Sequence, residues 1–181
     1  MEGICYLNII PEEIKKYIIS LTENKVFDLC LVNKYFNNNC KIIKIINNLR
    51  YQNITDAILK SLITLTYLDL RPNYNEITDE GMKGLINLTF LDLSLNKKII
   101  DEGIIRLTNL TSLNLAYNNI ITDKGIKGLT NLTFLNLYYN ETITDEGIKE
   151  LINLTSLYLS LNKKITDKTI EGLTNLTAKI I

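Results

Sequence analysis

Residues Ile77–Asn96 read ITDEGMKGLINLTFLDLSLN, and this stretch decides the fold because the chain repeats it. Three close copies follow, IIDEGIIRLTNLTSLNLAYN from Ile99, ITDKGIKGLTNLTFLNLYYN from Ile121 and ITDEGIKELINLTSLYLSLN from Ile143. Less regular copies begin at Ile54 and Ile165. One aspartate marks each copy, at Asp56, Asp79, Asp101, Asp123, Asp145 and Asp167. The chain is therefore a series of similar units, the first of 23 residues and the next four of 22.

Each unit contains the spacing LxxLxLxxN, as in Leu88, Leu91, Leu93 and Asn96. A period of about 20–29 residues with this spacing is the signature of a leucine-rich repeat solenoid. We therefore predict an α/β fold, a right-handed curved solenoid with a parallel sheet on its concave face and helical segments on its convex face. Strands are expected at residues 67–69, 90–92, 112–114, 134–136 and 156–158, and a last one from Ala178.

Side chains alternate between the two faces of a strand, so each unit should divide its residues between the core and the concave surface. Leu88, Leu91 and Leu93 are expected to stack on the equivalent leucines of the next coil. A column of asparagines should satisfy backbone groups of its own turn and of the next one. This column consists of Asn73, Asn96, Asn118, Asn140 and Asn162.

The start of each unit predicts a short convex helix. Thr78 is a suitable N-cap and is followed by acidic residues, which favour the positive end of a helix. Met82 and Leu85 should return to the core. A glycine recurs inside this helix although it costs about 1 kcal/mol against alanine, which indicates close contact between coils. The glycines are Gly81, Gly103, Gly125 and Gly147, with Ile58 and Thr169 in the end copies, where the neighbouring coils are incomplete.

The composition excludes several classes of protein. The formal net charge of zero argues against a nucleic-acid-binding surface, which needs clustered lysine and arginine. No apolar run approaches the roughly 20 residues of a membrane span. The N-terminus is acidic where a secretory signal is basic, so we expect a cytoplasmic or nuclear protein that is not secreted. The repeated sequon Asn87-Leu88-Thr89 is then a by-product of the repeat.

Residue types suited to catalysis are scarce. The chain has no histidine, which removes most general-base and histidine–metal schemes. Cys5, Cys30 and Cys40 show no CxxC spacing and are interpreted as small apolar packing residues. No paired carboxylates, phosphate-binding loop or metal cluster stands apart from the repeat pattern. We predict no enzyme activity, no catalytic residue, no metal and no cofactor.

The first forty residues do not follow the repeat. Pro11 followed by Glu12 and Glu13 suits the start of a helix, and the pattern to residue 39 predicts three short helices. The segments Ile10–Ile14 and Val26–Phe36, with Ile18–Leu21 between them, resemble an F-box. We therefore divide the chain into an F-box-like unit, residues 1–40, and a repeat domain, residues 41–181. The repeat domain would begin with a degenerate coil, residues 41–53, and continue with about six repeats, the last incomplete.

The resemblance implies an adaptor function. An F-box docks a Skp-type subunit of a cullin–RING ubiquitin ligase, and the repeats would then hold the target protein. The docking side chains implied by position are Ile10, Pro11, Ile14, Ile18, Leu29 and Val32. The alternative is that the N-terminal helices only cap the first coil, because so small a unit must pack on a neighbour. The chain would then be a stand-alone recognition module or effector.

The outward strand positions are the predicted target-binding surface. They carry aromatic residues that folding does not require, and aromatic residues are common anchors of protein interfaces. The predicted contact residues are Tyr67, Asp69, Phe90, Asp92, Phe134, Asn136, Tyr138 and Tyr158. Asp69 and Asp92 would favour a basic group on an unknown protein or peptide target. The competing interpretation is that the aromatic residues only pack on one another, with recognition on the loops after the asparagine column.

The last copy reads LTNLTAKII, which places Lys179 and Ile181 at inward leucine positions. Solenoids normally end in a polar cap, and a bare strand edge invites pairing. We therefore expect this end to fray or to self-associate.

Overall fold

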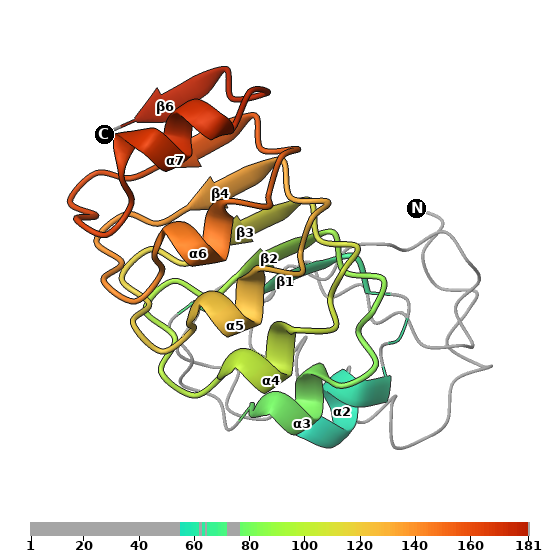
Figure 1. Ribbon diagram of the computed structural model, residues 1–181. Coiled ribbons are helices and arrows are strands. Elements are labelled where there is room, and N and C mark those ends of the chain that lie inside the picture. The colour runs from blue at the N-terminus through green and yellow to red at the C-terminus, as the bar shows by residue number, and fades with distance from the viewer. Residues whose placement is uncertain (1–54, 62, 64, 72–76, 181) are drawn as a thin grey trace, which may run out of the picture.

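The computed structural model is a solenoid of stacked coils, each with one strand and one helix (Figure 1), and it describes residues 55–61, 63, 65–71 and 77–180. The strands are β1 (Tyr67–Asp69), β2 (Phe90–Asp92), β3 (Ser112–Asn114), β4 (Phe134–Asn136), β5 (Ser156–Tyr158) and β6 (Ala178–Ile180). The helices are α2 (Asp56–Ser61), α3 (Asp79–Met82), α4 (Asp101–Ile104), α5 (Asp123–Ile126), α6 (Asp145–Ile148) and α7 (Asp167–Gly172).

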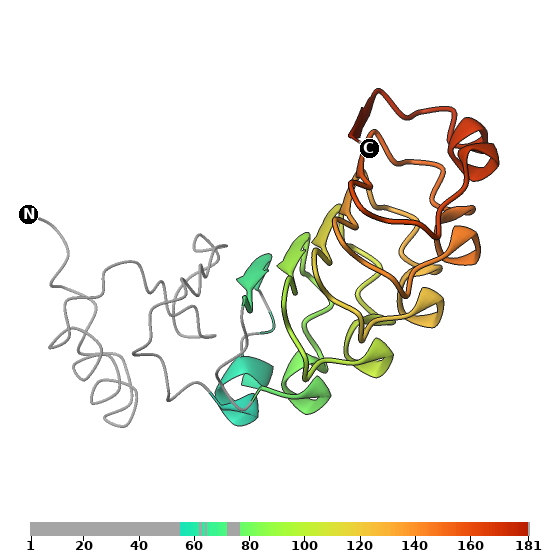
Figure 2. The same ribbon diagram turned by 90° about the vertical axis from the view of Figure 1, so that its left-hand side faces the viewer.

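The six strands form one parallel sheet in chain order. The register pairs each residue with its equivalent in the next coil, as in Phe90 with Ser112 and Ser112 with Phe134. In Figure 2 the strands follow the shorter, inner arc of the stack and the helices follow the longer, outer arc. The predicted strand positions, the parallel sheet and its place on the concave side are confirmed.

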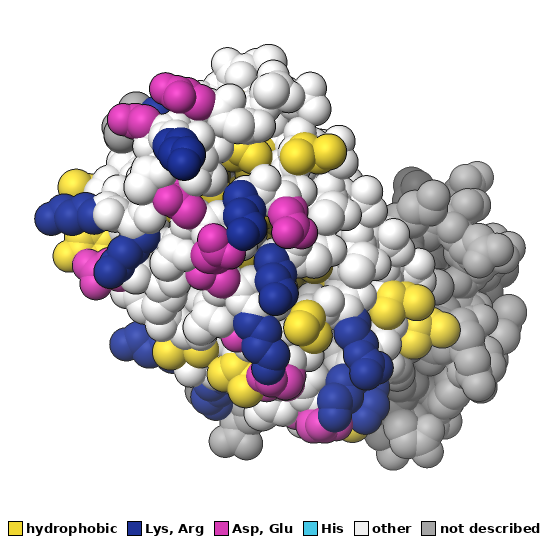
Figure 3. Space-filling model, in the orientation of Figure 1, with side chains coloured by type: hydrophobic (Ala, Val, Ile, Leu, Met, Phe, Trp, Pro, Cys, Tyr) yellow, Lys and Arg dark blue, Asp and Glu magenta, His cyan; other side chains and the backbone are white. Residues whose placement is uncertain are grey.

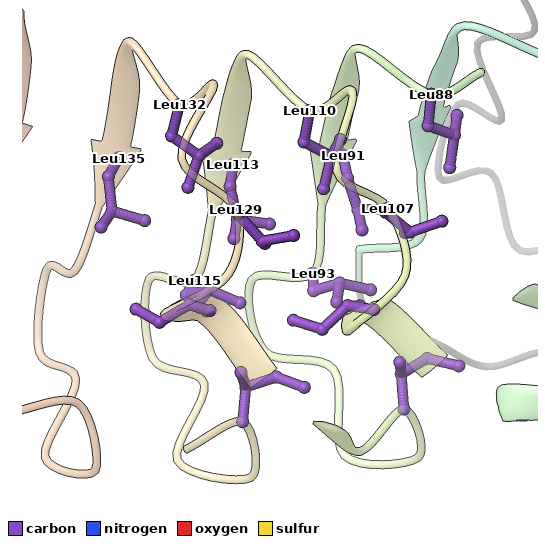
Figure 4. Packing of buried hydrophobic residues seen from close by; sticks show 14 of the residues in the cluster. Leu88, Leu91, Leu93, Leu107, Leu110, Leu113, Leu115, Leu129, Leu132 and Leu135 are labelled. Carbon is purple, nitrogen blue, oxygen red and sulfur yellow. The ribbon is translucent and has the colours of Figure 1, made fainter. Parts of the chain in front are cut away.

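Leucine and isoleucine side chains fill the space between the sheet and the helices. Leu88, Leu91 and Leu93 are fully buried and stack against the equivalent leucines of the next coil (Figure 4). Met82 and Leu85 also return to the core, as predicted. Because each coil covers the apolar side of its neighbour, the core runs the length of the stack as one cluster.

The helices α3 to α6 are four residues long, because the coil leaves little chain between the core residues on either side. Thr78 caps α3 through its hydroxyl oxygen, which accepts a hydrogen bond of 3.3 Å from the Glu80 N–H. Thr122 and Thr144 cap α5 and α6 in the same way. On the face shown in Figure 3, acidic and basic side chains are interleaved. One ion pair between neighbouring coils joins Lys124 and Glu102, whose Nζ and Oε1 atoms lie 2.6 Å apart.

The helix glycines lie where two coils touch, as predicted. A Cβ atom on Gly125 would be 2.6 Å from Oδ1 of Asp101 in the preceding coil. The expectation that Thr169 reflects an incomplete neighbouring coil stays a prediction; its side chain acts to lower the pKa of Asp145 in the preceding coil. In the other coils a glycine lets the helix backbone lie close to the aspartate of the preceding coil, whereas Thr169 places a polar side chain near Asp145. The side chain of Ile58 lies outside the described residues.

Several predictions fall on parts of the chain that the structure does not describe. These are the three F-box-like helices, the degenerate coil 41–53, Asn73 and Ile181. Lys179 does occupy an inward position opposite Leu157, and its Nζ atom reaches Oδ1 of Asp167 at 3.2 Å. Within the described residues, no helix has the length and apolarity needed to span a membrane.

Candidate interaction surface

Aspartates on the helical side link each coil to the next. Oδ1 of Asp101 accepts a hydrogen bond of 2.8 Å from the Thr122 N–H, and Oδ2 accepts one of 2.5 Å from the Thr122 hydroxyl. Asp56, Asp123 and Asp145 make the same two contacts. The sequence analysis assigned these residues only to their own helices. The aspartate is present in all six copies, whereas the residue that follows it varies between alanine, glutamate and lysine. This difference was the signal that the aspartate makes a contact between coils.

One link in this series is incomplete. Ile100 replaces the capping threonine, so Asp79 receives only the Ile100 N–H, at 3.0 Å. Burial raises the pKa of Asp79, and the single backbone donor does not compensate for it. At Asp145, burial also acts to raise the pKa, but the N–H and hydroxyl of Thr166 with the Thr169 hydroxyl lower it below its ordinary value. Asp79 is thus more deeply buried than Asp145 and also lacks a hydroxyl donor, and its pKa shifts in the opposite direction.

The asparagine column joins the coils where each strand ends. Oδ1 of Asn118 accepts from the N–H groups of Ile120 and Ile121, both at 3.0 Å. Its Nδ2 donates to the carbonyls of Leu93 and Asn96, at 2.9 and 3.2 Å. The structural role is confirmed, but the amide reaches the preceding coil rather than the next. Since Asn118 is fully buried, it is not a ligand contact.

A polar groove of about 770 Å³ runs across the coils before the strands begin. Its walls are the asparagine and threonine side chains of the sequons. Nδ2 of Asn109 donates to the Ile86 carbonyl at 2.8 Å, and Oγ1 of Thr111 donates to the Thr89 carbonyl at 3.1 Å. The equivalent residues of the other coils repeat these bonds. The groove thus supplies further links between coils.

Asp69 and Asp92, two predicted ligand contacts, are already bound within the protein. They are only 2% and 3% exposed. The Arg71 guanidinium lies between them, with 2.7 Å from Nη2 to Oδ2 of Asp69 and 3.0 Å from Nε to Oδ2 of Asp92. Asp92 also accepts a hydrogen bond of 2.7 Å from Asn114 Nδ2. The expectation that these carboxylates face a basic group on the target stays a prediction, and within the protein that basic group is Arg71.

A second local contact explains why the last residue of a strand is an aspartate or an asparagine in β1, β2 and β4. Oδ1 of Asp69 accepts from the Arg71 N–H at 3.1 Å, and Oδ1 of Asp92 accepts from the Ser94 N–H at 2.9 Å. Asn136 does the same for Tyr138, at 2.9 Å. These side chains shape the turn after each strand. Burial raises the pKa of Asp92 despite the hydrogen bonds from Ser94 and the other donors.

The aromatic residues of the concave face fall into two groups. Tyr67 and Phe90 stack on each other in the first two coils, with ring centroids 4.0 Å apart. Phe134 and Tyr158 form a looser pair at 5.4 Å, with their rings inclined by 47°. Tyr138 meets the edge of the Tyr117 ring at 5.1 Å. All five predicted aromatic positions are half-buried, so part of each ring faces solvent.

Sequence reasoning missed four residues at the rim of this face. Leu95, Tyr117, Tyr139 and Leu161 each precede the column asparagine and have positive φ values. All four side chains are exposed. The sequence did contain a signal for these four residues, since each is a bulky residue directly before a column asparagine. Glycine or asparagine suits the left-handed conformation of that position better.

Comparison with known proteins agrees with this architecture. A family model described as leucine-rich repeat matches residues 61–86, 84–107, 106–130, 128–152 and 150–173. The chain belongs to the leucine-rich repeat family. Leucine-rich repeat proteins generally mediate protein–protein interactions. The match does not extend over residues 1–40, so the F-box resemblance remains a prediction.

Two solved structures similar to this leucine-rich repeat chain are internalins from Listeria monocytogenes. An internalin (inlF) is 28% identical with a TM-score of 0.53, and the alignment covers 68% of this chain and 36% of the internalin. Internalin C2 (inlC2) is 26% identical with a TM-score of 0.53, covering 71% of this chain and 56% of the internalin. The chain thus spans only part of the length of either internalin. No curated protein matched the sequence.

The described part of this leucine-rich repeat protein holds no group of three or more cysteine, aspartate or glutamate side chains that could bind a metal ion. Its aspartates on the helical side bind threonines of the next coil, and those of the first strands bind Arg71. The aromatic concave face and its rim therefore remain as the candidate site.

Proposed function

We propose that the protein is a non-catalytic recognition module that holds a protein target on its concave face. The observation that carries this proposal is the set of partly exposed rings at Phe134, Tyr138 and Tyr158, presented by a sheet whose coils are hydrogen-bonded to one another. A rigid frame lowers the entropy lost on binding, and aromatic side chains are frequent anchors at interfaces. The general role of leucine-rich repeat proteins in protein–protein interaction supports it.

The surface favours an uncharged contact region on the target. In the described coils the charged residues at outward positions of the concave face are Asp69, Asp92 and Arg71, and both aspartates already bind Arg71. Around Phe134 and Tyr158 the neighbouring outward residues are Ser112, Asn136 and Ser156. Such a surface suits aromatic and aliphatic side chains with a few hydrogen bonds, which is the composition of interface centres.

The test is the double variant Phe134→Ala with Tyr158→Ala. We expect it to lose the target that co-purifies with the wild-type chain, identified by mass spectrometry and then measured by calorimetry. Because both rings are partly exposed, the circular dichroism spectrum should not change. Tyr67→Ala is the matched control, since Tyr67 lies in the stacked pair of the first coils. A target that still binds the double variant would move the recognition site away from these strands.

A second and finer function is that of a substrate receptor in a Skp–cullin–F-box ubiquitin ligase, which would require a cytoplasmic or nuclear location. The observation that favours it is the F-box resemblance of Ile10–Ile14 and Val26–Phe36. The purified chain should then bind a Skp-type adaptor, and Pro11→Ser with Val32→Asp should abolish that binding. The Phe134 and Tyr158 double variant should retain it. A chain that ignores the adaptor leaves the N-terminal segment as a cap alone.

A further inference from the structure

The turn after each strand places a bulky side chain where the backbone favours a small one. Leu95, Tyr117, Tyr139 and Leu161 have φ values of 60°, 55°, 52° and 63°. This left-handed conformation is strained for residues other than glycine, asparagine and aspartate, because Cβ approaches the following carbonyl oxygen. The protein accepts this strain in four consecutive coils. We call these four residues the rim ridge.

Exposure of the rim ridge is a second cost. The four side chains are 49%, 43%, 43% and 56% exposed, in chain order. Asparagine at these positions would relieve the backbone and remove apolar surface from water. The solvent-exposed part of each leucine or tyrosine side chain therefore contributes nothing to folding. Strained backbone that carries exposed apolar side chains is expected where a surface is used for binding.

The rim ridge is continuous with the concave face. Its members share one repeat position, so neighbours lie about 4.8 Å apart along the sheet. The Tyr117 ring contacts Tyr139 along the ridge and Tyr138 on the sheet, each with 5.1 Å between ring centroids. A partner that covers Tyr117 and also reaches Tyr138 must follow a curved surface. A polypeptide can do this, whereas a flat membrane cannot.

The charges near the rim ridge distinguish between the two remaining binding partners, a second copy of this chain and a different polypeptide. Lys97 and Lys98 follow Leu95 at one end of the rim ridge, and Lys163 and Lys164 follow Leu161 at the other end. All four are exposed. In a symmetric pair of copies, the lysines of one ridge would face those of the other in either orientation. Such juxtaposed like charges oppose self-pairing and instead complement a partner that is acidic at both ends.

We propose that the rim ridge binds a polypeptide segment with apolar or aromatic side chains at its centre and acidic residues toward both ends. This proposal rests on the proposed function, because the rim ridge and the concave face would contact the same target. It adds the second surface of that site and the charge pattern of the segment that the surface selects.

The test compares the full chain with a variant in which asparagine replaces the rim ridge. The four changes are Leu95→Asn, Tyr117→Asn, Tyr139→Asn and Leu161→Asn. Since asparagine adopts the left-handed conformation more readily, we expect the melting temperature to stay the same or rise. A lower melting temperature would show that the ridge stabilises the fold and would overturn the proposal.

Binding is probed with a displayed library of random peptides long enough to span the ridge. Peptides selected on the wild-type chain should carry a central aromatic or leucine residue with aspartate or glutamate on both sides. We expect the asparagine variant to bind them at least about tenfold more weakly. Exchanging the four lysines for glutamine should weaken binding and reduce its salt dependence.

Three results would overturn the proposal: no selected peptide, peptides without acidic residues, or peptides that bind the asparagine variant equally well. Ridge-dependent sedimentation with vesicles of phosphatidylcholine and phosphatidylserine would do so as well, in favour of a membrane. The Phe134→Ala, Tyr158→Ala variant separates the two hypotheses. If it binds the peptides normally while the asparagine variant does not, the rim ridge stands and the concave-face proposal fails.

Discussion

The two halves of the concave face solve the same structural problem with different residues. In the first two coils, Tyr67 stacks on Phe90, and Arg71 neutralises two buried aspartates. In the later coils, Phe134 and Tyr158 meet only loosely. The first half therefore pairs its own charges and stacks its rings closely, whereas the rings of the second half contact each other less closely. A residue at an outward strand position is a binding candidate only if its neighbours leave it available.

The largest effect is expected from a substitution that weakens the hydrogen bonds between coils at the boundary of the two halves. Asn118→Leu removes the acceptor for the Ile120 and Ile121 N–H groups and the donor to the Leu93 and Asn96 carbonyls. We expect a loss of on the order of 3 kcal/mol, because several buried backbone groups lose their partners. Urea denaturation measures it.

The half-buried Asn162 provides the control for this change, since its amide donates to one carbonyl of the preceding coil, that of Asn140. Asn162→Leu should cost less than Asn118→Leu. Equal costs for the two variants would contradict the role of the column as a ladder between coils.

The next largest loss of stability is expected when Arg71, the cation of the first half, is removed. Arg71→Met leaves Asp69 and Asp92 buried without their ion pair, and we expect a loss of about 2 kcal/mol. This is below the figure for a fully buried pair because the Arg71 side chain is 44% exposed. Arg71→Lys should cost less, since it keeps the charge but not the planar contact with two carboxylates. Target binding at Phe134 and Tyr158 should persist.

The effect of Arg71→Met depends on pH. Burial already raises the pKa of Asp92, and loss of the arginine raises it further. A carboxylate with a raised pKa in the folded state destabilises the fold increasingly as pH rises through that pKa. The loss should therefore shrink on acidification. A loss that stays constant between neutral and acidic pH would contradict a charge effect.

A gain is expected on the helical side. Ile100→Thr supplies the hydroxyl that Asp79 lacks and caps α4, which should stabilise the protein by about 1 kcal/mol at neutral pH. Because burial raises the pKa of Asp79 in the wild type, a donor to the carboxylate helps only where Asp79 is ionised. The part of the gain that comes from the Asp79 contact should be lost as pH falls through that pKa, and the part that comes from capping α4 should remain. Ile105→Thr, also on the exposed surface but at the C-terminal end of α4, away from the N-cap and from Asp79, should bring no such gain.

The smallest effect on stability is expected for Tyr158→Asn. Asparagine at this position can accept from the N–H two residues later, as Asn136 does, but the contact with Phe134 is lost. The two contributions are similar in size, so stability should change by less than about 0.5 kcal/mol. Target binding should nevertheless be lost. A variant that retains the target would show that Tyr158 belongs to the self-satisfied part of the face.

The repeat pattern was sufficient to predict the coil. Each unit must bury its leucines against identical leucines one period away, so the spacing of Leu88, Leu91, Leu93 and Asn96 predicted the strands, the parallel sheet and the core. It also predicted the buried asparagine column, since a turn closed between two coils needs an amide to satisfy its backbone. The aromatic residues of the candidate site were found from the alternation of side chains alone.

Which of the outward residues are available for binding depends on contacts between coils that the repeat pattern does not contain. Asp69 and Asp92 are occupied because Arg71 lies between two neighbouring strands, and that contact depends on packing rather than on period. The rim ridge was hidden for the same reason, because the φ angles of Tyr117 and Tyr139 follow from how the chain leaves one strand beside the next. Repetition in a sequence predicts where a side chain points, whereas contacts between coils decide whether it is free to bind.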